Sequence, residues 1–339
     1  MRTASRGFSP LDERWGLTRS VYAPQWARQL VWLSSLLPYA QVVEVVERIG
    51  HRRVPSASIR QQVQRYGERI TAQVQREQET VSIERTILPT SGVDHSQVKG
   101  ISLDGGKVHL RGEGWKEFKV GAVFDVVPCP YQDPETREMV ERARAQHIAY
   151  TAVIGPPEQL GPGLWATAVR QGVPRARDSV VVADGAEWIW HLARDYFPDS
   201  VQILDWYHAC EHLAQAGQAL YPGDDPAAQR WYRGRQGDLF QGRIHAITLP
   251  LELQGLSEQA AYFHKHKRRM RYQEFREYGY PIGSGTVESG IKQCKARLVG
   301  AGMHWSRLGA ERMLTLRTAV LSHRFDHLWH AAAQAPPPI

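Results

Sequence analysis

The feature that most constrains the fold of this sequence is a short apolar run, Val180-Val181-Val182-Ala183, that ends in Asp184. A strand with one face in water alternates apolar and polar residues. A continuous run is instead typical of a parallel strand that helices cover on both faces. A helical pattern at 188–198, an apolar run at 201–204 and another helical pattern follow. The sequence therefore predicts an α/β core in which parallel strands alternate with helices.

Three further strands are predicted upstream of that run. Residues 99–110, interrupted by Gly105-Gly106, and residues 118–128 and 147–155 are rich in β-branched and apolar residues and suggest an antiparallel meander. Residues 157–173 read as a helix. Three hairpin-type strands followed by α-β-α-β is the order of a ribonuclease H-like mixed sheet. No strand of similar quality appears in 213–280, so we expect an all-helical insertion there, followed by a long helix that starts near Thr286.

The amino-terminal region has a different, helical pattern. Apolar residues recur at spacings of three and four over 23–49, and a second helical pattern begins near Ser56 or Ser58 and carries Arg60 and Arg65. Two helices joined by a short turn outline a helix-turn-helix that reads DNA, or an ordinary amphipathic pair. The predicted domains are a helical region at 1–94, a first core part at 95–212, the insertion at 213–280, core helices at 281–334 and a disordered tail at 335–339.

Composition limits the class of partner and the compartment. Lys plus Arg exceed Asp plus Glu by 42 to 35, which gives a net charge of +7 and suits a polyanionic partner. The three cysteines are far apart and form no zinc-binding pair, as is common in a reducing cytosol. No segment has the length of a membrane span and the amino terminus lacks a signal-peptide pattern. A cytoplasmic, nucleoid-associated protein without membrane contact is expected.

Three carboxylates are the candidate catalytic residues: Asp104, Asp184 and Glu288. Asp184 closes a buried strand, at the edge of an open α/β sheet where ligands gather. Taken singly, each has a plain structural alternative. Asp104 precedes Gly-Gly and suits a turn, Asp184 suits a helix cap, and Glu288 in a first helical turn is favoured by the helix dipole. Together, in this order, they favour a shared site.

The chemistry that such carboxylates serve is phosphodiester cleavage with divalent metal ions. Two hard cations can bind the attacking and the leaving oxygen, and oxygen ligands suit Mg²⁺, with Mn²⁺ as a substitute. We therefore expect Asp104, Asp184 and Glu288 to be the ligands of two metal ions.

Other polar residues are candidates for supporting roles. Asp205 and His208 follow the next strand. They either order the rim of the site or contact DNA near the cut, or they serve as a helix cap and a first-turn residue. Lys292 and Lys295 follow Glu288 at i+4 and i+7, on the same helix face. The basic run at 264–271 is either a solvated face or a DNA contact. The candidate DNA-binding residues are Arg60, Arg65, Lys265, Lys267, Arg268, Arg269, Arg297 and Trp305.

Four segments of this sequence resemble bacterial insertion-sequence transposases of the Kra type, which are relatives of the Mutator-like transposases. The segments are SLDGG, VVVADGAEWIW, ILDWYHACEHL and YPIGSGTVESGIKQCKARLVGAGMHWS, and the resemblance covers about residues 8–330. It implies a catalytic Asp-Asp-Glu triad at Asp104, Asp184 and Glu288, a helical insertion before the Glu, and an Asp-x-x-His motif at Asp205 and His208. A Glu-x6-Lys pattern shared by many such enzymes falls on Glu288 and Lys295.

The amino-terminal segment departs from that family. Relatives usually carry a cysteine-rich zinc ribbon before a segment like Pro10-Leu11-Asp12-Glu13, and no such cysteines precede it here. A truncated copy or a different start site is expected.

The function expected from the sequence is that of a DNA transposase of the DDE type. It would cleave DNA at the ends of an insertion sequence and transfer strands into target DNA, as a homodimer or higher oligomer. Two alternatives stay open. One is a truncated or inactive transposase-derived protein that binds DNA without cutting it, and the other is a different ribonuclease H-like nuclease.

Overall fold

The computed structural model describes residues 22–81, 94–132 and 137–334. The predicted tail at 335–339 and the segment Pro10-Leu11-Asp12-Glu13 lie outside these ranges. The chain divides into two compact units. The first contains 1–76, 109–114 and 296–339, and the second contains 77–108 and 115–295. The domain boundaries predicted from the sequence stay a prediction.

The first unit is built mainly of helices. They are α2 (Pro24–Leu36), α3 (Tyr39–Gly50), α4 (Ser56–Thr80, of which the unit contains the part up to residue 76), α13 (Arg307–Leu321) and α14 (Phe325–Gln334). The predicted helical stretch at 23–49 is two helices, because Pro38 cannot continue the first. Leu30, Val42 and Ile59 are fully buried in a small core. The ring of Tyr66 stacks on that of Trp329 at 4.1 Å.

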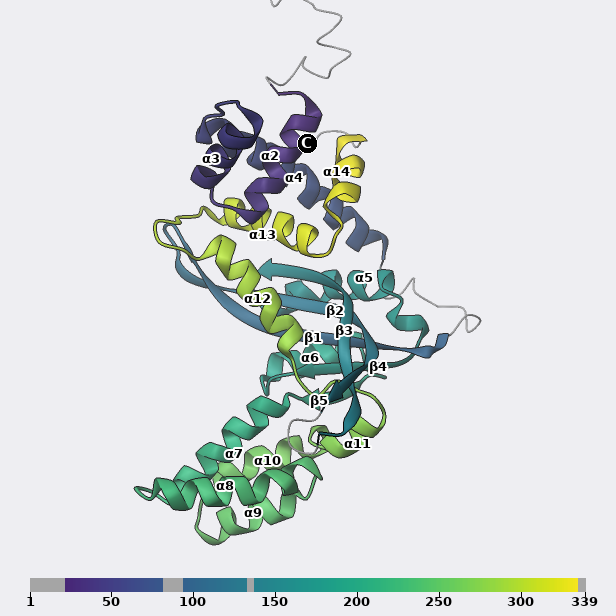
Figure 1. The fold of residues 1–339 in the computed structure, drawn as a ribbon, viewed down its shortest axis with the longest axis vertical. Helices are drawn as coiled ribbons and strands as arrows, with labels where there is room; N and C mark the ends of the chain where they lie inside the picture. The colour runs from purple at the N-terminus through teal and green to yellow at the C-terminus, as the bar shows by residue number, and fades with distance from the viewer. Residues whose placement is uncertain (1–21, 82–93, 133–136, 335–339) are drawn as a thin grey trace, which may run out of the picture. The chain divides into compact units, whose positions relative to one another are not determined.

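The second unit contains a mixed five-stranded sheet with the order β3-β2-β1-β4-β5 (Figure 1). The strands are β1 (Asp94–Leu110), β2 (Gly114–Gln132), β3 (Met139–Ile154), β4 (Ala176–Ala183) and β5 (Val201–Leu204). β2 pairs antiparallel with β3, whereas β4 runs parallel to both β1 and β5. The α/β class and the two parallel strands predicted from continuous apolar runs are thus confirmed. Val180, Val181, Val182 and Ala183 are all fully buried.

Helices cover both faces of this sheet. α5 (Leu160–Arg170) lies against Thr151 of β3, since a Cβ on Gly163 would stand 2.8 Å from the Thr151 hydroxyl. The next residue of β3 back along the chain, Tyr150, contacts α12 (Gly285–Leu298), where a Cβ on Gly290 would stand 2.5 Å from its ring. Neighbouring residues of a strand point to opposite faces, so α5 and α12 cover opposite faces (Figure 1).

Between β5 and α12 the chain is helical throughout, as predicted. It forms α7 (Trp206–Leu220), α8 (Asp225–Phe240), α9 (Ile244–Leu253), α10 (Ser257–His266), the short turn η4 (Lys267–Arg269) and α11 (Tyr272–Glu277) (Figure 1). α6 (Glu187–Tyr196) connects β4 to β5. Within the described ranges, no helix is long and apolar enough to cross a membrane.

Candidate active site

Three aspartates stand in one row across the parallel strands. β1 and β4 pair as far as Ile101 opposite Val181, and Asp104 and Asp184 each lie three residues beyond that pair. β4 and β5 pair with Ala183 opposite Leu204, so Asp205 comes next to Asp184 in turn. The Asp205 N–H donates to the Ala183 carbonyl at 2.8 Å, which extends the pairing to the row itself. The row follows from the register.

A single pocket collects this row and the predicted glutamate. It has a volume of about 200 Å³ and is lined by Leu103, Asp104, Asp184, Asp205, Tyr207, His208, Glu211, Ser284 and Glu288. Since a water molecule takes about 30 Å³ of liquid, the pocket has room for several waters or hydrated ions. The structure thus places all three predicted catalytic carboxylates in one cavity.

Asp104 has the most perturbed electrostatics of the row. Its Oδ1 accepts a hydrogen bond from the Gly105 N–H at 2.6 Å. Burial raises the pKa of Asp104, and the nearby charges of Asp184 and Glu288 raise it further, while the Gly105 N–H and the Lys295 ammonium act in the opposite direction. A carboxyl group that resists ionisation beside two other acids is a position where a cation would be stabilising.

Asp184 directly follows β4 and shapes the turn that leads into α6. Its Oδ1 accepts a hydrogen bond from the Ala186 N–H at 3.0 Å, which shapes the turn before α6. The residue at the N-cap position of α6 is Ala186, so Asp184 shapes the turn without being the cap. Its Oδ2 accepts no hydrogen bond from the described part of the chain and is available to a ligand.

Asp205 is the most tightly bound acid of the site. It is 3% exposed, and its Oδ1 accepts the His208 N–H at 2.8 Å as the N-cap of α7. Its Oδ2 accepts two bonds from Ser284, from the N–H at 2.6 Å and from the hydroxyl at 3.0 Å. The helix-cap interpretation of Asp205 is confirmed, and the same carboxylate also fixes the segment that leads into α12.

Ser284 joins that anchor to Glu288. The Ser284 hydroxyl lies 3.0 Å from Asp205 Oδ2 and 3.3 Å from Glu288 Oε1. A hydroxyl has one proton and can donate to one of the two carboxylates at a time. Glu288 itself is in the exposed first turn of α12. Its position therefore depends on the docking of Ser284 more than on packing of its own.

The other predicted residues near the site lie at its rim. His208 Nδ1 is 3.6 Å from Glu211 Oε2, and the His208 and His212 rings are 5.0 Å apart. Lys292 and Lys295 are exposed on α12, and the stem of Lys295 would come within 3.1 Å of a Cβ at Gly106, beside Asp104.

Four residues of the pocket were not predicted from the sequence: Leu103, Tyr207, Glu211 and Ser284. Ser284 lies within the segment that begins YPIGSGTVESG, which carries part of the resemblance, but no role was predicted for it. Glu211 follows His208 at i+3, a spacing that places two side chains together on a helix.

The predicted DNA-binding residues have divergent environments. In the first unit Arg60 is exposed, whereas Arg65 lies 5.5 Å from the centre of the Tyr66 ring. Arg297 and Trp305 are 2% and 9% exposed. Arg297 donates from Nε to the Ser34 carbonyl at 2.6 Å and its guanidinium lies 5.0 Å from the Trp305 ring centre. Both residues therefore have the environment of core residues, and no ligand is needed to account for their positions.

The basic run at 264–271 is divided in its contacts. Lys265 is paired with Glu187 at 2.5 Å, and Arg269 donates to Gln202 at 2.9 Å and covers the Trp190 ring. Lys267 and Arg268 are exposed and line a pocket. The prediction of a DNA contact therefore concentrates on the latter two.

Two further findings bear on the site. Among the residues that the structure describes, no group of three His, Cys, Asp or Glu side chains is arranged to hold a metal ion as it stands. No family model matches the chain, and no curated protein matches it either.

Proposed function

We propose that this chain is a DDE-type DNA transposase, which cleaves DNA at the ends of an insertion sequence and joins those ends to target DNA. The observation that carries the proposal is the row Asp104, Asp184 and Asp205, with Glu288 opening onto the same pocket. Asp104 lies within β1, and Asp184 and Asp205 directly follow β4 and β5. Acids brought together in one pocket in this way suit a reaction at a phosphodiester.

The donor set fits divalent metal ions in chemistry and charge. The side chains that point into the pocket are dominated by carboxylates, and oxygen donors without cysteine suit Mg²⁺ or Mn²⁺. Burial raises the pKa of Asp104, and the neighbouring charges of Asp184 and Glu288 raise it further, so a bound cation would offset an electrostatic cost at this position. Asp104, Asp184 and Glu288 would hold the ions, and two bound cations would supply activation of the attacking oxygen and stabilisation of the leaving one.

The chain's own groups have distinct tasks in this proposal. Asp104 and Asp184 are held by backbone N–H groups, so they form the rigid side of the site. Glu288 enters on a helix whose start is anchored by Ser284 to buried Asp205. Lys292 and Lys295 extend along the same helix and are positioned to bind phosphates that flank the cut.

The strand order supports the finer fold assignment. A mixed sheet with order β3-β2-β1-β4-β5 and helices on both faces agrees with a ribonuclease H-like core. The helices between β5 and α12 agree with the insertion expected before the glutamate. In this proposal α2 to α4 contribute to DNA binding, and two or more copies assemble when the element's ends are brought together.

The test is metal-dependent cleavage and joining by the full-length protein. The substrate is plasmid DNA that carries the gene for this protein together with several hundred flanking base pairs. In this proposal those flanks contain the ends of the insertion sequence. We expect nicking and strand transfer with Mg²⁺ or Mn²⁺ and none with EDTA. Asp104→Asn should abolish both reactions while leaving DNA binding intact. Asp199→Asn, the same change at an exposed carboxylate after α6, should leave them unchanged.

The outcomes separate the alternatives. Cutting without joining would favour another ribonuclease H-like nuclease. DNA binding by the wild-type protein without metal-dependent cutting would favour a non-catalytic DNA-binding protein. Normal cleavage by the Asp104→Asn variant would refute the assignment of the site.

A further inference from the structure

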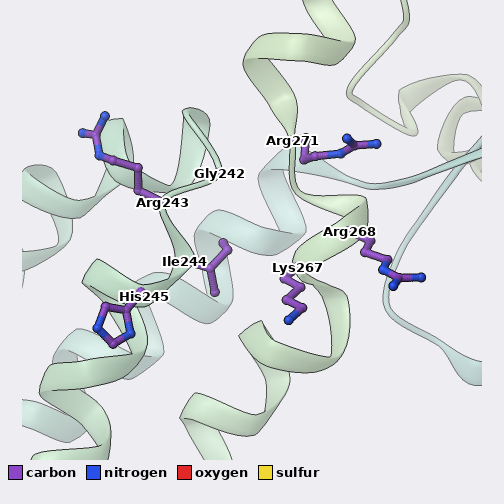
Figure 2. A pocket seen from close by; sticks show the side chains of 7 residues that line it. All are labelled: Gly242, Arg243, Ile244, His245, Lys267, Arg268 and Arg271. Carbon is purple, nitrogen blue, oxygen red and sulfur yellow. The ribbon is translucent and has the colours of Figure 1, made fainter.

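A second pocket lies in the helical insertion, away from the acidic row. It has a volume of about 520 Å³ and lies between the α8–α9 turn and the segment that runs from η4 to α11. Its lining is Gly242, Arg243, Ile244, His245, Lys267, Arg268 and Arg271 (Figure 2). Four of these residues carry a permanent positive charge and none is acidic. Such a lining attracts anions.

Both walls of the pocket are fixed by local structure. Gly242 has a φ of 71°, which lets the chain turn sharply after α8. Arg243 donates from Nε to Asp238 at 2.8 Å, and Asp238 is 7% exposed. On the other wall, Met270 between Arg268 and Arg271 is fully buried and anchors the basic segment. The positive charges are therefore presented by a defined surface.

Among the described residues, two of the four positive charges of this pocket are paired with carboxylates and two are not. Arg243 pairs with Asp238 at 2.5 Å. Lys267 and Arg268 are exposed and pair with no carboxylate in the described ranges, while Arg271 has a surface pair with Glu274 at 3.0 Å. Their neighbour Lys265 pairs with Glu187. Two adjacent unpaired cations on a surface cost stability through mutual repulsion, which an anionic ligand would relieve.

We propose that this pocket binds the phosphate backbone of duplex DNA. In Figure 2 the guanidinium groups of Arg268 and Arg271 point to one side, that of Arg243 points to the other, and Lys267 lies between them. A single phosphate cannot contact charges that diverge in this way, whereas the successive phosphates of a DNA strand can. The choice of DNA over another polyanion rests on the proposed function.

The pocket is connected to the sheet by two side-chain contacts. Lys265, just before η4, bonds Glu187 at the start of α6, and Arg269 within η4 bonds Gln202 of β5. α6 begins shortly after Asp184, and β5 leads into Asp205. DNA held at Lys267 and Arg268 would thus be held in a fixed relation to the acidic row. The pocket would act as a backbone contact that aligns DNA for the proposed reaction.

The experiment is DNA binding by the full-length protein in EDTA, measured by fluorescence anisotropy of a labelled duplex over a series of salt concentrations. The double variant Lys267→Ala/Arg268→Ala removes the two unpaired cations. Each phosphate contact contributes about 0.9 to the slope of log affinity against log salt, a factor of about 8 between 1 M and 0.1 M. We expect binding up to about 60-fold weaker at 0.1 M salt and a slope smaller by about 1.8.

A matched control removes the same charge from the same insertion. Arg230→Ala/Arg233→Ala changes two exposed residues of α8 outside the pocket and should keep the wild-type slope. Equal effects of the two double variants would overturn the inference, as would inorganic phosphate binding at the pocket with unchanged DNA affinity.

Failure of this inference and failure of the proposed function are distinguishable. Because EDTA prevents metal-dependent cleavage, the binding result does not depend on catalysis. A pocket variant that loses binding, in a protein that never cuts DNA, would sustain the inference and refute the transposase. Normal cleavage and joining with unchanged binding by the pocket variant would refute the inference alone.

Discussion

Replacing Asp104 by Asn should stabilise the protein without metal and remove its stabilisation by metal. The carboxyl group of Asp104 is partly buried beside Asp184 and Glu288, and its pKa is raised in the folded state. The folded state therefore holds the Asp104 proton more tightly than the unfolded chain does. The resulting stability is full below the unfolded pKa and is lost as pH rises through the folded pKa. At neutral pH the ionised group is a net cost.

Asparagine has nearly the same shape and no charge, and its oxygen can still accept the Gly105 N–H bond. The metal-free variant should accordingly unfold at a higher temperature than the wild-type protein at pH 7.5. Mg²⁺ should do the reverse. An ion at 100 times its dissociation constant stabilises the folded state by about 2.7 kcal/mol. For a folding unit of this size that is about 5–10 °C in melting temperature, and Asp104→Asn should lose most of it.

The measurement is thermal unfolding of both proteins, with EDTA and with millimolar MgCl₂, with Asp199→Asn as the matched control. The control should show the wild-type shift with Mg²⁺. The reasoning is refuted if Asp104→Asn lowers the melting temperature without metal, or if its shift with Mg²⁺ equals that of the wild-type protein.

Three further predictions concern other residues. Ser284→Ala removes the hydroxyl that links Glu288 to Asp205. It should lower kcat or metal affinity about 10-fold or more, with the KM for DNA unchanged. Steady-state cleavage assays check this, with Ser289→Ala as the control variant. Arg297→Ala leaves a cavity next to Trp305 and should lower the free energy of unfolding by about 2–4 kcal/mol in urea titrations, without changing DNA affinity in the folded protein. His266 is buried and its pKa is lowered to about 4, so the folded state favours the neutral ring. Its contribution to stability is present above about pH 6.5 and is lost as pH falls toward 4, and His266→Gln should flatten that part of the curve of melting temperature against pH.

The sheet was predictable from sequence because its buried strands are rich in apolar residues, and that enrichment is visible in the sequence. The continuous run at 180–183 indicated a strand covered on both faces, and the structure buries all four residues. The five strands lie where the sequence predicts them, but β1 to β4 begin earlier than predicted and β2 also ends later. Strand ends are set by pairing partners, which a single strand does not reveal.

The site was predictable as a set of acids but not as a structure. Asp104, Asp184 and Glu288 were identified as candidates and reach one pocket. The row that includes Asp205 depends on the register between strands far apart in sequence. The role of Ser284 depends on a contact with Asp205 across the whole insertion. Contacts of this kind leave no periodic signal in the chain.

For the basic residues, the sequence shows the charge but does not show whether the side chain is buried. Sequence position alone grouped Arg297 with Lys267 and Arg268 as DNA contacts, because charge is visible in a sequence and burial of a lone cation is not. The structure separates them: Arg297 is sandwiched between the rings of Tyr39 and Trp305. An arginine among aromatic residues is as well suited to a core as to a nucleic acid.

The order of the four acidic residues along the chain also has a consequence for biosynthesis. The three aspartates lie within or directly after strands that leave the ribosome early, whereas Glu288 emerges only after the complete helical insertion has been made. A nascent chain can thus form its sheet and the acidic row while the fourth carboxylate is still missing. If the pocket cuts DNA as proposed, the enzyme would stay inert until synthesis is nearly complete, and a chain terminated anywhere within the insertion would lack one of its three proposed metal ligands.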